Sequence, residues 1–152
     1  MLRIAVVILQ QVKSLKLNSY TMERKLLIAG CSFAVIAVIL GALGAHALEK
    51  VLGPQQIKSF ETGVRYQLFH AVALIAFSQV NLLSDSSKNI LLYLFMAGML
   101  MFCFSIYALS LSKWLNMNLK FLGPITPLGG LSLISGWFFA LWKIISHNSI
   151  NN

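Results

Sequence analysis

The stretch LLIAGCSFAVIAVILGALGAHAL, residues 26–48, contains no charged side chain. A helix of this length can cross a bilayer, because about 20 apolar residues at about 1.5 Å each span its roughly 30 Å hydrocarbon core. The whole chain is 58% hydrophobic and 11% charged, whereas charged residues make up about 25% of a typical soluble domain. The sequence therefore predicts an integral membrane protein.

Three further stretches without charge follow, and we predict spans at residues 66–84, 90–112 and 121–142. The short polar turn at residues 84–89 makes the second and third spans an antiparallel hairpin. These spans use up most of the 152 residues, so no separate soluble domain fits. The predicted fold is an all-α integral membrane protein, with four transmembrane helices in one domain over residues 22–144.

The connector between the first two spans predicts a short amphipathic helix. It begins at Pro54, since proline is favoured at the first position of a helix. Apolar and charged side chains then separate onto two faces at helical spacing. The apolar face has Ile57, Phe60 and Val64, and the charged face has Lys58, Glu61 and Arg65. We expect this helix to lie at the membrane interface and to run into the second span.

The fourth span opens with residues 123–130, where two prolines and three glycines fall within eight positions. Proline removes a backbone donor and glycine raises backbone freedom, so this segment does not fit an ordinary helix interior. In lipid, the freed carbonyl groups must find partners within the protein. We expect a broken or re-entrant helix start that packs against the other helices.

The two ends of the chain have less definite structure in the sequence. The apolar run at residues 4–9 is shorter than the core of about 7–15 residues in a signal peptide. Residues 1–21 either form a basic amphipathic helix on the membrane surface, with Lys13 and Lys16, or are not native because translation starts at Met22. At the other end, we expect residues 145–152 to be an exposed tail.

The net charge of +8 comes from 12 Lys and Arg against 4 Asp and Glu. In a membrane protein such an excess favours contact with anionic lipid head groups. The basic residues are scattered and have no interleaved aromatic patch, which argues against nucleic acid as a partner. Seven of them lie on the side of the amino terminus and five on the other side. This count predicts a multi-pass membrane protein with both termini in the cytoplasm, although a start at Met22 leaves four against five.

The polar side chains that could do chemistry gather in residues 41–70 and at the start of the fourth span. His46 ends the first span and His70 lies near the start of the second, so we expect the two histidines at a similar depth. Polar groups inside a membrane are costly and often mark function. The candidate residues for a ligand site or a structural polar network are His46, Glu49, Glu61, Arg65, Tyr66, Gln67, His70 and Thr126.

Three hypotheses compete for these residues. In the first, they hydrogen-bond to one another and to the irregular backbone at residues 124–130, and so hold the helices together. In the second, they bind a small polar ligand, a lipid head group or a quinone. In the third, His46 and His70 ligate a haem or a metal ion. Haem needs both imidazoles facing one cavity, and a tetrahedral metal site needs more ligands than two histidines.

Segments distributed along residues 26–143 are similar to one known family. The matching pieces are residues 41–46, 62–70, 105–107, 126–130 and 136–137. On these motifs the chain resembles the YgdD-like family of small membrane proteins, domain of unknown function 423. The family has a small Ser-Gly pair where this chain has Cys103 and Phe104, which argues against close helix packing there. Residues 1–21 have no counterpart in the family. The resemblance implies four membrane helices in a cell membrane and no established activity.

We therefore expect a non-enzymatic structural or accessory membrane component. No Ser-His-Asp arrangement, nucleotide-binding loop or carboxylate within a span indicates catalysis, so we assign no catalytic residue, metal or cofactor. The alternative is a small-ligand protein, for quinone, lipid head group or haem, centred on His46 and His70. The small residues of the first span could pack against the other helices, a membrane-protein partner or a second copy of the chain.

Overall fold

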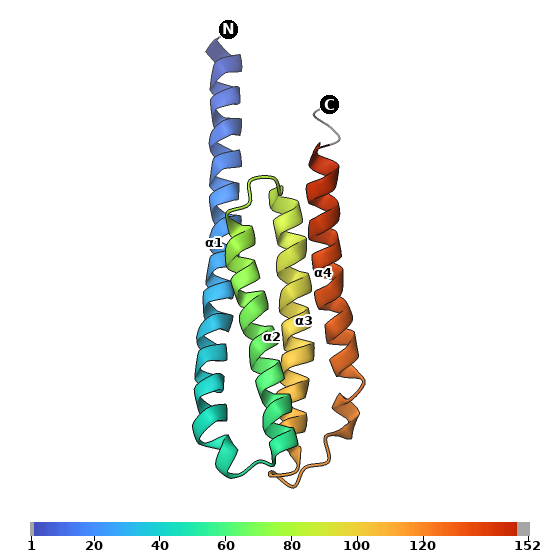
Figure 1. Ribbon diagram of the computed structural model, residues 1–152. Helices are drawn as coiled ribbons and strands as arrows, with labels where there is room; N and C mark the ends of the chain where they lie inside the picture. Colours follow the sequence, from blue (N-terminus) through green and yellow to red (C-terminus); the bar gives the residue numbers. More distant parts are fainter. Residues whose placement is uncertain (1, 149–152) are drawn as a thin grey trace.

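The computed structural model describes the backbone of residues 2–148, and the side chains of that range except residues 2–9, 12, 15–19, 147 and 148. It consists of helices throughout, which confirms the predicted all-α class. Neighbouring helices run in opposite directions, and both ends of the chain lie at the same end of the molecule (Figure 1). The long helices are α1 (Leu2–His46), α2 (Pro54–Ser78), α3 (Asp85–Ser112) and α4 (Ile125–Asn148), with short 3-10 helices η1 (Leu48–Lys50) and η2 (Lys120–Leu122).

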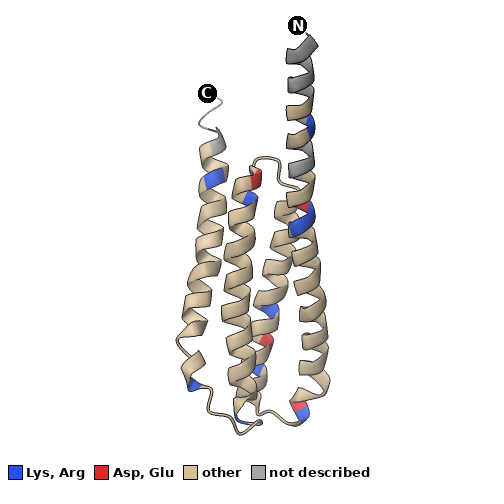
Figure 2. Ribbon diagram, turned by 180° about the vertical axis from the view of Figure 1, so that it is seen from behind, with Lys and Arg blue, Asp and Glu red and all other residues tan. Residues whose placement is uncertain are grey.

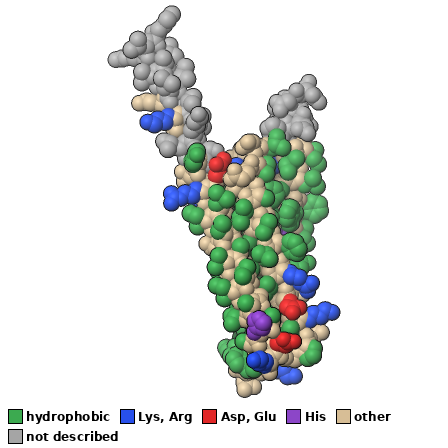
Figure 3. Space-filling model, turned by 60° about the vertical axis from the view of Figure 1, so that its left-hand side comes forward, with side chains coloured by type: hydrophobic (Ala, Val, Ile, Leu, Met, Phe, Trp, Pro, Cys, Tyr) green, Lys and Arg blue, Asp and Glu red, His purple; other side chains and the backbone are tan. Residues whose placement is uncertain are grey.

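Three helical segments of the described chain are long and apolar enough to cross a membrane. They are Tyr20–Lys50, Asp85–Ser112 and Lys120–Ser146. Within residues 20–146, charged residues lie near the two ends of the helices and along one half of α2 (Figure 2). In the space-filling view hydrophobic side chains cover the middle of the molecule, as expected for a surface in contact with lipid (Figure 3).

Helix α1 continues beyond the other helices toward the amino terminus (Figure 1). Most side chains of residues 1–21 lie outside the described residues, so the hypotheses of a surface helix and of a start at Met22 remain predictions. At the other end, α4 extends to Asn148, so the first part of the predicted tail is helical. Residues 149–152 lie outside the described residues.

Helix α2 begins and ends earlier than the predicted second span of residues 66–84. It starts at Pro54, after Gly53 as N-cap, and ends at Ser78, so residues 79–84 form a turn. The physical reason is one continuous buried face that runs from Phe60 through Gln67 to Phe77. The segment predicted as an interfacial helix from Pro54 is the first part of α2 and runs into the second predicted span, as expected.

Small residues let neighbouring helices approach closely. A Cβ atom on Gly30 of α1 would lie 2.8 Å from the carbonyl oxygen of Ala71 in α2. A Cβ atom on Gly129 of α4 would collide with the backbone nitrogen of Phe102 in α3. These glycines therefore support packing within the chain. The described core lies mainly between α1, α2 and α3, and α4 packs on α3.

The segment of residues 123–130, rich in proline and glycine, does not break the fourth helix. The turn at Gly123 and Pro124 precedes α4, and Pro127 lies in its first turn, where the backbone N–H groups have no partner within the helix in any case. The expected loose packing at Cys103 is wrong. Cys103 is fully buried, whereas Phe104 is 49% exposed. The larger of the two side chains therefore does not separate the helices.

Candidate functional site

Gln67 of α2 connects three helices through its side-chain amide. Its Nε2 donates a hydrogen bond of 2.9 Å to the carbonyl oxygen of Phe33 in α1. Its Oε1 accepts a hydrogen bond of 2.9 Å from the hydroxyl of Tyr107 in α3. The side chain is 1% exposed, so both bonds form away from water. This polar group is completely buried and has a partner at each end of its amide.

Gly63 makes the Tyr107 contact possible. Gly63 and Gln67 are four residues apart and so lie on the same face of α2. A Cβ atom at position 63 would lie 2.6 Å from Cε1 of Tyr107, which is too close for real atoms. The ring of Phe60 packs on the other side, with its centroid 4.8 Å from that of Tyr107. Phe60 and Gly63 of α2 therefore form the surface against which the Tyr107 ring of α3 packs.

His70 connects α2 to α4. The indole Nε1 of Trp137 lies 3.1 Å from Nε2 of His70, and Nδ1 of His70 lies 2.7 Å from the carbonyl oxygen of Tyr66. An indole N–H can only donate, so Nε2 is the acceptor. A carbonyl oxygen can only accept, so Nδ1 has the proton. The imidazole is therefore neutral, with both nitrogens engaged by the protein.

Aromatic rings enclose this imidazole. The ring centroid of Phe95 in α3 lies 5.3 Å from that of His70 in an edge-on arrangement, and that of Trp137 lies 6.1 Å away. The His70 side chain is 6% exposed. The imidazole of His70 therefore has no nitrogen lone pair available to a ligand, and other side chains cover nearly all of the ring.

The two histidines do not share a depth, contrary to the prediction. His46 is the last residue of α1 and is exposed, whereas His70 is buried well inside α2. Because α2 begins at Pro54, the 16 residues from Pro54 to His70 place His70 about 24 Å along the helix at about 1.5 Å per residue. The expected junction of the two imidazoles does not form.

The charged candidates also lie away from the buried groups. Glu49, Glu61 and Arg65 are exposed. Tyr66 is 46% exposed, and its ring packs on Phe102 with centroids 4.8 Å apart. Of the predicted set, the structure brings only Tyr66 and His70 together by a hydrogen bond, through the Tyr66 backbone.

Thr126 has a separate role at the start of α4. Its Oγ1 lies 2.7 Å from Oγ of Ser105 in α3, and Ser105 Oγ donates a hydrogen bond to the carbonyl oxygen of Phe102. Since Ser105 has one hydroxyl hydrogen, Thr126 is the donor in the pair of hydroxyls. Further along the same interface, Ser132 donates to the carbonyl oxygen of Leu94. Hydroxyl groups thus connect α4 to α3 at two levels.

A pocket of about 300 Å³ lies beside Thr126, between α2, α3 and the start of α4. The hydroxyl oxygen of Ser110 is buried there and has no hydrogen-bond partner. The residues that line the pocket are Gln55, Gln56, Ser59, Ile106, Leu109, Ser110 and Thr126. The described residues include no group of three or more His, Cys, Asp or Glu side chains that could hold a metal ion.

Sequence reasoning missed the partners Tyr107 and Trp137, and it placed Lys88 in an exposed turn. In the structure Lys88 is 2% exposed, and its Nζ donates to the carbonyl oxygen of Ser78 and lies 3.6 Å from a carboxylate oxygen of Glu23. One signal was available. Ser84 caps α3 by accepting from the backbone N–H of Ser87, so Lys88 belongs to the first turns of an apolar helix.

Comparisons with known proteins point to one family. Residues 40–130 match the family model described as protein of unknown function (DUF423). The chain is 37% identical over 123 residues to the UPF0382 membrane protein YwdK of Bacillus subtilis, covering 80% of this chain and 96% of the relative. It is 34% identical over 120 residues to the UPF0382 inner membrane protein YgdD of Escherichia coli K12, covering 78% and 88%. No solved structure matches.

Proposed function

We propose a non-enzymatic, structural or accessory role in the membrane for this chain, which belongs to the DUF423 family of membrane proteins. The supporting observation is that the polar groups within its apolar helices are bonded to one another across helices. Gln67 joins α2 to α1 and α3, and His70 joins α2 to α4. A general acid or base must present a proton or lone pair to a substrate, and His70 has neither free.

The same proposal includes α2 as a fourth membrane span. Gly44 near one end of α1 faces Phe60, and Gly30 nearer the other end faces Ala71, so α2 runs alongside α1 over most of the apolar length. A helix of 25 residues is about 37 Å long, which is enough to cross the bilayer. Arg65 would then extend its charged end toward the head groups. The first turns of α2 would supply the interfacial helix.

For location, we propose the bacterial inner membrane, with both termini in the cytoplasm and contacts to anionic lipids. The name of the Escherichia coli relative places that protein in the inner membrane. Counted from Met1, seven Lys and Arg belong to segments at the end near the termini and five to segments at the other end, in keeping with the positive-inside tendency. Reporter fusions at residues 83 and 118 test this: the fusion at 83 should report cytoplasm and the fusion at 118 the opposite side. The reverse result would contradict the orientation.

The test of the structural role separates stability from activity. His70→Ala should lower the unfolding temperature in mild detergent, because Trp137 loses its hydrogen-bond acceptor in a buried site. The same variant should complement a deletion strain only to the extent that its protein level is maintained. A variant with normal stability and normal abundance that fails to complement would contradict a purely structural role.

A second candidate function is the binding of a small neutral ligand such as a quinone. The observation that favours it is the buried Ser110 hydroxyl without a partner beside a pocket of amides and hydroxyls. This pocket replaces the predicted site at His46 and His70, whose imidazoles lie far apart along the bundle. Ubiquinone-1 should raise the unfolding temperature of the wild type but not of Ser110→Ala. An equal rise in the unfolding temperature of the wild type and of Ser110→Ala would contradict quinone binding in this pocket. For haem, protein purified from haem-supplied cells should show no Soret band.

A further inference from the structure

We propose that a pocket between α1 and α3, at the end of the molecule near the chain termini, binds the head group of a phospholipid that has both a phosphate and a primary ammonium group. The pocket has a volume of about 260 Å³, below the range of about 300–1,000 Å³ typical of sites for drug-sized ligands. It therefore suits a head group better than a whole lipid. Its lining residues are Thr21, Met22, Lys25, Asp85, Ser86 and Asn89.

The position of the pocket along the helices matches the depth of lipid head groups. The uncharged part of α1 begins at Leu26, directly after Lys25. The uncharged part of α3 begins at Ile90, directly after Asn89. The pocket therefore lies where apolar helix meets polar end, which in a bilayer is the boundary between hydrocarbon and head groups.

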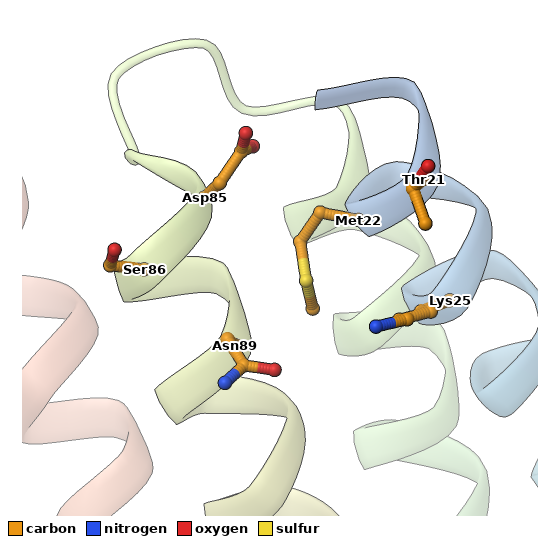
Figure 4. A pocket seen from close by; sticks show the side chains of 6 residues that line it. All are labelled: Thr21, Met22, Lys25, Asp85, Ser86 and Asn89. Atoms are coloured by element: carbon orange, nitrogen blue, oxygen red, sulfur yellow. The ribbon is translucent and has the colours of Figure 1, made fainter. Parts of the chain in front are cut away.

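Two opposite charges line the pocket from different helices. Lys25 extends from α1 and Asp85 from α3 (Figure 4). The single ion pair among the side chains that the structure describes joins Lys88 to Glu23, so Lys25 and Asp85 form no ion pair with each other. A dipolar head group would satisfy both. Its phosphate would accept hydrogen bonds from Lys25, and its ammonium would donate to the carboxylate of Asp85.

The order of these groups along the membrane normal agrees with a phospholipid. Figure 4 shows Lys25 and Asn89 at a similar level, with Asp85 nearer to the turn that joins α2 and α3. In a bilayer the phosphate of a phospholipid lies deeper than the ammonium at its tip. Lys25 and the amide of Asn89 are therefore placed for the phosphate, and Asp85 for the ammonium.

The buried ammonium of Lys88 and the partly exposed carboxylate of Glu23 hold the helices that line the pocket. Lys88, one residue before Asn89, is held by the carbonyl oxygen of Ser78 and by Glu23. Because Glu23 belongs to α1 and Ser78 ends α2, this contact fixes the start of α3 against both helices. The helices that line the pocket are thus fixed before a lipid binds, which lowers the conformational entropy lost on binding.

The experiment measures thermal unfolding of the delipidated full chain in detergent against added lipid. The probes are phosphatidylethanolamine, phosphatidylcholine, phosphatidylglycerol and inorganic phosphate. Phosphatidylethanolamine should stabilise the wild type at the lowest concentration, because its ammonium can donate hydrogen bonds and the trimethylated group of phosphatidylcholine cannot. Lys25→Gln should raise the half-saturating concentration about tenfold, as expected for the loss of a charged hydrogen bond. Asp85→Asn should remove the preference over phosphatidylglycerol.

Arg24→Gln is the matched control, since Arg24 is exposed, adds the same charge and does not line the pocket. It should respond to phosphatidylethanolamine like the wild type. Each variant is compared with its own lipid-free unfolding temperature, so a change in basal stability does not obscure the lipid response. An equal loss in Arg24→Gln, an equal response to phosphatidylethanolamine and phosphatidylglycerol, or the same stabilisation by inorganic phosphate alone would overturn the proposal.

Discussion

The two histidines in the described part of the bundle differ in almost every physical respect. His70 is buried, and each of its ring nitrogens has a protein partner. His46 ends α1 at the surface. The same residue type therefore connects two helices in one place and is exposed at the end of a helix in the other. The comparison shows that partners and burial, rather than residue type, decide which polar group of a membrane helix is important for the fold.

The largest expected effect comes from removing the buried histidine. His70→Ala should lower the free energy of unfolding by about 3 kcal/mol, since it leaves a cavity and an unpaired indole N–H at Trp137. His46→Ala should change it by less than about 0.5 kcal/mol, as is usual at an exposed site. Thermal unfolding in detergent measures both. Equal effects of the two substitutions would remove the distinction on which the comparison depends.

A smaller effect is expected at the amide that joins α1, α2 and α3. Gln67→Leu should cost about 2 kcal/mol, because the Tyr107 hydroxyl loses its buried acceptor. Tyr107→Phe should cost about 1 kcal/mol. The double variant should be less destabilised than the sum of the two single variants, since both remove the same bond. Strict additivity in this double-mutant cycle would show that the two side chains do not interact.

The glycine beside that bond gives a steric test. Gly63→Ala should cost about 1–2 kcal/mol, because the new methyl group must displace the ring of Tyr107. Gly41→Ala is the matched control on α1, since a Cβ atom there would meet its nearest neighbour, Val64, at an ordinary 3.4 Å. Unfolding temperatures of the two variants should therefore differ clearly. An unchanged unfolding temperature in Gly63→Ala would contradict the close contact between position 63 and the Tyr107 ring.

The smallest effect is expected on the exposed face of α2. Arg65→Gln and Glu61→Gln should each change the free energy of unfolding by less than about 0.5 kcal/mol, because neither side chain has a buried partner. The measurement is the same thermal unfolding series. A loss as large as that of Gln67→Leu would mean that the exposed charges take part in holding the helices together.

Sequence patterns predicted the helical class and the apolar segments because lipid imposes long uncharged helices. They misplaced α2 because absence of charge was used as its boundary. Residues 79–84 have no charge and form a turn, whereas Lys58 and Arg65 are charged and belong to a helix whose other face is buried. A helix that is buried on one side tolerates charge on the other, so the buried face was the better guide.

The candidate site was less predictable than the fold. Gln67 and His70 were among the candidate residues, but their partners Tyr107 and Trp137 are 40 and 67 residues away in sequence. Only the packing of α2 and of α4 against α3 brings these side chains together. Lys88 was missed for the same reason, since its burial depends on contacts with Glu23 in α1 and with the end of α2.

The protonation state of His70 tests the central claim most directly. Nitrogen NMR of the imidazole in detergent micelles at neutral pH distinguishes the two neutral tautomers. The structural account predicts a proton on Nδ1 and an unprotonated Nε2 that accepts from Trp137, with the Nε2 signal shifting in Trp137→Phe. A proton on Nε2, or an Nε2 signal that responds to an added ligand but not to Trp137→Phe, would contradict it.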